Sequence, residues 1–81
     1  MSSEALGFLI FPNPARATIS FQTSAEASTT YRILNQLGQV LRTGQTPPGV
    51  ATLPVNDLLN GCYFLELQTE QGRVIRKFEK E

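Results

Sequence analysis

The residues that could carry chemistry are few and scattered along the chain. There is no histidine and only one cysteine, Cys62, which excludes an internal disulfide and a zinc site built from several cysteines. Without histidine the serines have no evident general base, and the sequence shows no glycine-rich phosphate loop, Walker pattern or acidic calcium loop. We therefore predict no catalytic residue, no metal ligand, no cofactor and no small-molecule substrate.

The acidic and aromatic residues favour structural roles. Paired carboxylates at a fixed separation are needed for hydrolysis, but the acids fall in expected loops, on outward strand faces and near the two ends. Most aromatic residues occupy alternating strand positions, which favours a core role over a sugar platform or a base-stacking surface. Cys62 lies in an apolar run and is expected to be a small core residue.

One short stretch concentrates positive charge. Four of the seven basic residues lie close together near the C-terminus: Arg73, Arg76, Lys77 and Lys80. The formal net charge is zero, so no global field draws in nucleic acid or an acidic membrane. We predict an exposed basic edge strand. Such a strand protects a sheet from aggregation or accepts a partner strand, and the residues leave open weak self-association with a second copy.

Alternating short runs must position this edge. Cys62–Gln68 and Arg73–Glu79 flank a short loop that contains Gly72, which predicts a hairpin with a central strand and an edge strand. The same period-two pattern predicts five upstream strands: Phe8–Phe11, Ala17–Gln22, Thr29–Asn35, Gln39–Thr43 and Ala51–Val55. About seven short strands with frequent turns predict an all-β, immunoglobulin-like seven-stranded antiparallel sandwich, with a small barrel as the alternative.

The connections carry their own signals. Asn35–Gly38 is expected to be a tight turn, and Gly44–Gly49 a loop at a sheet edge. Asn56–Gly61 is expected to form one helical turn or a compact corner, with its leucines tucked under the sandwich and a left-handed residue at its end. Residues 8–81 then form one domain, preceded by the tail or linker Met1–Gly7, which has no features of a signal peptide or membrane span.

Four blocks of sequence follow one another with compatible spacing: Phe11–Ala15, Tyr31–Val40, Val55–Phe64 and Gly72–Phe78. Together they resemble the type A C-terminal sorting domain of the type IX secretion system. Phe11-Pro12-Asn13-Pro14-Ala15 is similar to the "YPNP" opening of that family. The other blocks are Tyr31–Val40 around Gly38, Val55–Phe64 with Gly61 and Tyr63 in a Gly-x-Tyr pattern, and Gly72–Phe78 with its basic residues. Glu79 departs from the pattern, since the family usually has an apolar residue there.

The resemblance implies a non-catalytic sorting signal of Bacteroidetes-type bacteria. In that family an upstream cargo, covalently linked to the domain, crosses the periplasm and is directed through the outer-membrane translocon. A sortase-like peptidase commonly removes the domain, and the cargo is attached to the cell surface or secreted. The implied structural motif positions are Pro12, Asn13, Pro14, Gly38, Gly61 and Tyr63. The candidate translocon-recognition residues are Arg73, Arg76, Lys77 and Lys80, and Met1–Gly7 would be a linker remnant from the cargo.

Two other functions stay open. An adhesive or carbohydrate-binding accessory sandwich would need exposed aromatic side chains such as Tyr63 and Phe64, although the alternation predicts that Tyr63 points inward. A structural spacer would need nothing from the basic strand except solubility.

Overall fold

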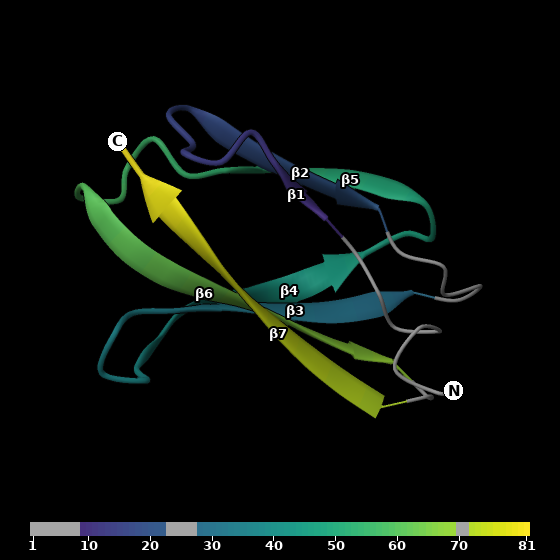
Figure 1. Cartoon of the computed structure of the whole chain (residues 1–81). Helices are drawn as coiled ribbons and strands as arrows, with labels where there is room; N and C mark the ends of the chain where they lie inside the picture. The colour runs from purple at the N-terminus through teal and green to yellow at the C-terminus, as the bar shows by residue number, and fades with distance from the viewer. Residues whose placement is uncertain (1–8, 23–27, 70–71) are drawn as a thin grey trace.

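The computed structural model describes residues 9–22, 28–69 and 72–81. The strands in these ranges are β1 (Ile10–Phe11), β2 (Thr18–Gln22), β3 (Thr29–Leu34), β4 (Val40–Thr46), β5 (Val50–Pro54), β6 (Gly61–Thr69) and β7 (Gly72–Lys80). They form two stacked antiparallel sheets, with strand orders β1-β2-β5 and β4-β3-β6-β7 (Figure 1). The predicted seven-stranded sandwich is confirmed.

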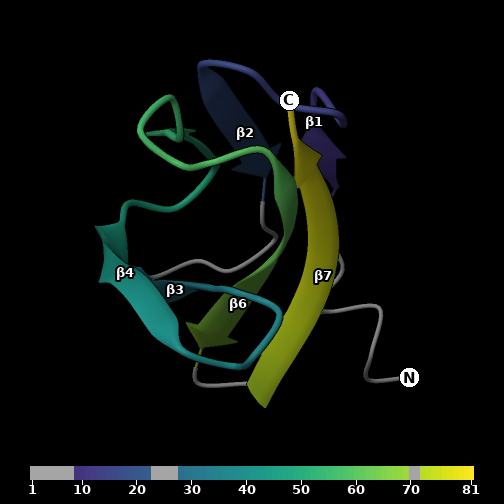
Figure 2. The same ribbon diagram turned by 90° about the vertical axis from the view of Figure 1, so that its left-hand side faces the viewer.

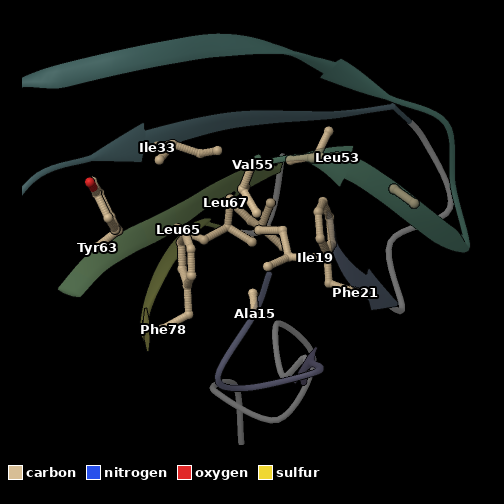
Figure 3. Close-up of a cluster of buried hydrophobic side chains, with 11 residues drawn as sticks. Ala15, Ile19, Phe21, Ile33, Leu53, Val55, Tyr63, Leu65, Leu67 and Phe78 are labelled. Atoms are coloured by element: carbon tan, nitrogen blue, oxygen red, sulfur yellow. The ribbon is translucent and has the colours of Figure 1, made fainter. Parts of the chain in front are cut away.

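The core lies between the two sheets because alternate residues of each strand point inward. Ile19 and Phe21 of β2 face Ile33 of β3 and Leu65 of β6 across the sandwich (Figure 3). Burying an aliphatic or phenylalanine side chain of this size contributes about 1.5–3 kcal/mol. Among the described residues, the buried apolar ones are Ala15, Ile19, Phe21, Ile33, Ala51, Leu53, Val55, Tyr63, Leu65, Leu67 and Phe78.

Asn35–Gly38 is a tight turn, as predicted. The Gly38 N–H donates to the Asn35 carbonyl at 3.0 Å. The Asn35 side-chain oxygen accepts bonds from the backbone N–H groups of Leu37 and Gln39, at 2.9 and 3.0 Å. Gly38 has a φ of 85°, which a residue without Cβ adopts at little cost. The turn joins β3 to β4.

The predicted loop Gly44–Gly49 is wrong in its first half, because β4 continues to Thr46. Gly44 pairs with Tyr31 of β3. A Cβ at Gly44 would lie 2.8 Å from Cε2 of the Tyr31 ring. Glycine here therefore leaves room for an aromatic ring that covers the strand, whereas the sequence pattern alone favours a strand end.

The corner Asn56–Gly61 is compact, but it forms no helical turn. Leu58 packs against the core as expected. Leu59 does not tuck under the sandwich, since 82% of its surface is exposed. Its backbone carbonyl accepts a 2.6 Å hydrogen bond from the Tyr63 hydroxyl, so the corner is held through its backbone. Gly61 follows with a positive φ of 149°.

An ion pair joins β4 to the corner that follows β5. The Arg42 guanidinium donates to both carboxylate oxygens of Asp57, at 2.7 and 2.8 Å, and also to the Pro54 carbonyl. This hydrogen-bonded guanidinium holds the pKa of the Asp57 carboxyl below its ordinary value of 3.8. Charge on Asp57 therefore favours the folded state.

We expect the Arg42–Asp57 pair to make part of the stability depend on acid pH. A carboxyl whose pKa is lower in the folded state stabilises above its unfolded pKa, and the contribution is lost as the pH falls through the folded value. The difference in melting temperature between the wild type and Asp57→Asn should thus be largest near neutral pH and shrink at pH values below about 3.8.

Thermal unfolding followed by circular dichroism at a series of pH values measures this difference. Glu81→Gln is the matched control, because it removes an exposed carboxylate outside the ion pair. A wild-type advantage over Asp57→Asn that stays constant down to the lowest pH would contradict the assignment.

Candidate recognition edge

The basic strand lies at the edge of the four-stranded sheet, as predicted. β7 pairs with β6 along its whole length in one uninterrupted register, from Gly61 opposite Lys80 to Thr69 opposite Gly72. Figure 2 shows it as a long curved strand along the margin of that sheet. On its other side, the described residues supply one ladder partner, Ala15 opposite Lys80. The rest of that side has no strand next to it among them.

Alternation divides the side chains of β7 between two faces. Phe78 points into the core and stacks on Tyr63, with ring centroids 5.8 Å apart and ring planes at 26°. Ile75, Lys77 and Glu79 alternate with it and belong to the outer face of the sheet. Glu79 is exposed there, so its charge is compatible with the fold even though the family usually has an apolar residue.

Three of the four predicted recognition residues are exposed: Arg73, Arg76 and Lys77. Arg73 is 3.2 Å from the carboxylate of Glu66, yet 63% of its side chain remains accessible. Glu66 also lies 3.7 Å from Arg32, and its own side chain is only 7% exposed. An Arg–Glu–Arg group on the outer face thus holds the Arg73 guanidinium through its Nε atom and leaves most of the Arg73 side chain accessible near the edge.

Lys80 differs from the expectation of an exposed residue. It is only 8% exposed, and its Nζ donates a 3.0 Å hydrogen bond to the Leu58 carbonyl. Its charge also contributes, less than Arg42, to the lowered pKa of Asp57. Lys80 shares the inward face with Phe78, and the Asn56–Gly61 corner lies over it. The sequence pattern does not reveal that cover.

The segment that carries the Pro-Asn-Pro motif holds the C-terminal end of β7. The Glu79 N–H donates to the Asn13 side-chain oxygen at 3.0 Å. The Ala15 N–H donates to the Glu79 carbonyl, and the Glu81 N–H donates to the Ala15 carbonyl, both at 2.7 Å. The peptide bonds before Pro12 and Pro14 are cis. Since Ala15 lies between β1 and β2, these bonds join the two sheets.

The sequence motif contains Asn13 but does not identify its partner, and it indicates no separate role for Ala15. Asn13 and Glu79 are 66 residues apart, and no local pattern connects them. A buried alanine directly after the motif, with no exposed surface, is a weak sign of close backbone approach. The motif therefore holds the end of β7 through the Asn13 side chain and the Ala15 backbone.

Other parts of the described chain offer no competing site. Tyr63 is 8% exposed, so its ring is not available as a sugar platform. An open hollow of about 330 Å³ beside the Asn35–Gly38 turn is lined by that turn and by residues 59–63. Cys62 lies at this hollow and is half-buried. It does not belong to the core cluster, so the prediction of a core residue is wrong. Within residues 9–22, 28–69 and 72–81, no acid and cysteine cluster could hold a metal ion, and no helix could cross a bilayer.

We expect Asn13→Ala to loosen the C-terminal end of β7. The substitution leaves the Glu79 N–H without its acceptor, and loss of such a side-chain-to-backbone bond costs about 0.5–1.5 kcal/mol. Amide hydrogen exchange at Glu79 should accelerate, while exchange in the centre of β6 changes little. Asn60→Ala, at an exposed asparagine, is the control. Unchanged exchange at Glu79 in Asn13→Ala would contradict the role of the motif.

We also expect Lys80 and Lys77 to respond differently to the same change. Lys80→Glu places a carboxylate against the Leu58 carbonyl in a buried site, which should cost about 3–5 kcal/mol. Lys77→Glu changes an exposed side chain and should alter stability by about 0.5 kcal/mol or less. Urea unfolding measures both. Equal effects would show that Lys80 is exposed like its neighbour.

Comparisons with known proteins agree with this geometry. Residues 9–81 match the family model described as "Secretion system C-terminal sorting domain". No curated protein matches the chain significantly. Among solved structures, the chain is similar to PorZ, described as an essential bacterial surface component of the type IX secretion system of Porphyromonas gingivalis. The TM-score is 0.72 at 18% identity, and the match covers 99% of this chain but 12% of that one.

The likeness to PorZ shows the sandwich fold alone. The match to the family model, over nearly the whole chain, shows the family. The family match agrees with the resemblance noted in the sequence. The chain belongs to the family of type IX secretion system C-terminal sorting domains.

Proposed function

We propose that this domain is a non-catalytic signal that directs an upstream cargo protein through the outer-membrane type IX translocon, for cleavage and cell-surface attachment or release. Membership in the sorting-domain family supports export across the outer membrane and an interaction with the type IX machinery. We include three further features in the proposal: a contact with the translocon, removal by a peptidase, and a covalently linked cargo.

The observation that carries the proposal is the placement of β7. A recognition signal must present a feature that a partner can reach. Arg73, Arg76 and Lys77 are exposed on an edge strand. The buried Lys80 is better assigned to holding the Asn56–Gly61 corner, through its bond to Leu58. We therefore place recognition on the three exposed cations.

The position of cleavage follows from the access that a peptidase needs. Proteases require an extended, accessible backbone, and such segments concentrate at chain ends outside folded strands. Residues 1–7, interpreted as linker, lie outside the described residues. Cleavage by a sortase-like peptidase within or before them would release the cargo without unfolding the sandwich.

Export of a fused reporter tests the proposal. Residues 1–81, joined to the C-terminus of a reporter carried to the periplasm of a type IX host, should bring the reporter to the cell surface or the medium. Fractionation and protease accessibility of intact cells measure its location. A folded fusion that stays in the periplasm would contradict the proposed function.

Charge reversal tests which residues are recognised. We expect that a fusion carrying both Arg76→Glu and Lys77→Glu stays mostly in the periplasm. The reversed charges would be repelled by a partner surface that attracts the cations of the wild type. Arg73 is left intact because it pairs with Glu66. Arg16→Glu, at an exposed arginine before β2, is the control and should be exported normally. Normal export of the double variant would show that Arg76 and Lys77 are not the recognised residues, and the sorting function would stand.

A further inference from the structure

The outward side of β7 consists of two parts with different properties. At the C-terminal end, both backbone groups of Glu79 are used by Asn13 and Ala15. From Arg73 to Lys77, no described strand pairs with the outward side, and we call this stretch the open edge. In an antiparallel pair without a register shift, backbone groups at alternate residues point away from the partner. Because those of Glu79 do so, those of Lys77, Ile75 and Arg73 do so as well.

A second observation supports the direction of these groups. The Ile75 carbonyl accepts a 3.2 Å hydrogen bond from the guanidinium of Arg76, the next residue along the strand. The bond shows that a donor from outside the β6–β7 ladder can reach this carbonyl. The guanidinium is on an exposed, long side chain, so an incoming backbone N–H could replace it.

Side chains on both sides of the open edge would meet an added strand. Arg73, Ile75 and Lys77 belong to the outer face, in the order basic, apolar, basic, and Ile75 is 47% exposed. Arg76 alternates with them toward the other face. Directly opposed side chains of opposite charge in antiparallel strands stabilise pairing, and opposed like charges destabilise it.

These charges argue against a second copy as the occupant. If two β7 strands paired antiparallel about Ile75, Arg73 of each copy would lie opposite Lys77 of the other. Two like-charge pairs would then oppose the single apolar contact between the isoleucines. Shifting the register toward the C-terminus brings in Glu79, whose outward backbone groups already bond to Asn13 and Ala15.

We propose that the open edge binds an extended strand of a partner protein that carries acidic, apolar and acidic residues at alternate positions. The acids would lie opposite Arg73 and Lys77, and the apolar residue opposite Ile75. Backbone bonds would supply the affinity, and the alternate side chains the selectivity, as in other cases of strand addition. The proposal deepens the proposed function, on which it rests for the identity of the partner as part of the export machinery.

A peptide tests the strand chemistry on the whole chain 1–81. The probe is a capped, fluorescently labelled peptide with the core Glu-Thr-Ile-Thr-Glu, and the control has the core Lys-Thr-Ile-Thr-Lys. We expect the acidic peptide to bind and the basic peptide to bind at least about fivefold more weakly, since two opposed charge pairs reverse sign. No binding of the acidic peptide, or equal binding of both, overturns the proposal.

Ile75→Pro tests backbone pairing. It removes the outward N–H but none that bonds to β6, and proline is tolerated on an edge strand in that position. Binding should weaken about tenfold, while Ile75→Thr, which keeps the N–H, should retain more of it. Thermal unfolding of both variants confirms that they are folded. If Ile75→Pro is unfolded, methylation of the central peptide nitrogens of the probe gives the same test on the wild type.

Undiminished binding to Ile75→Pro, or of the methylated probe, would overturn strand addition. Sedimentation of the chain without peptide tests the other occupant. A dimer that Ile75→Pro abolishes and the acidic peptide cannot displace would identify a second copy and overturn the acidic partner.

The reporter fusion separates the two proposals. If the wild-type fusion is exported and Ile75→Pro is retained, strand addition and the sorting function are both supported. If folded Ile75→Pro is exported as well as the wild type, strand addition as the mode of recognition is overturned and the sorting function stands. If the wild-type fusion is itself retained while the acidic peptide binds, the sorting function fails and the strand-binding edge stands.

Discussion

The structure depends on the backbone pairing between Ala15 and the end of β7. Two 2.7 Å hydrogen bonds and the Asn13 side chain connect a segment of the three-stranded sheet to the margin of the four-stranded one. Figure 1 shows the C-terminal end of β7 reaching the layer that contains β1 and β2. Sandwich sheets otherwise cohere through side-chain packing. Here a directional backbone contact also fixes the position of the strand that carries the exposed cations.

This pairing explains why the motif and the basic strand belong together, although they lie at opposite ends of the sequence. Asn13 and Ala15 occupy the last outward backbone groups of β7, while Phe78 and Lys80 fill its inward face. An unprotected edge strand risks uncontrolled association. Shortening the accessible stretch and placing Arg73 and Lys77 along it limits the strands that can pair there.

The fold could be predicted from the sequence because its signals are local. Period-two alternation in Ala17–Gln22 and Cys62–Gln68 identifies strands and their buried faces, and Asn35 with Gly38 identifies a turn. What failed depends on contacts between distant residues. Lys80 is buried because the Asn56–Gly61 corner covers it. β4 continues through Gly44 because this residue pairs with Tyr31, whose ring takes the space of a Cβ. The candidate edge was located correctly, but the use of its final backbone groups by Asn13 and Ala15 has no local signal.

The order of the strands along the chain has a consequence for synthesis. β7 is the last of the seven strands to leave the ribosome, and it supplies Phe78 to the core and the pairing partner of Ala15. A nascent polypeptide interrupted before Gly72 would leave one edge of β6 without its backbone partner and Tyr63 without its stacked ring. Such a product could not complete the sandwich, so the domain can finish folding only after β7 has been synthesised.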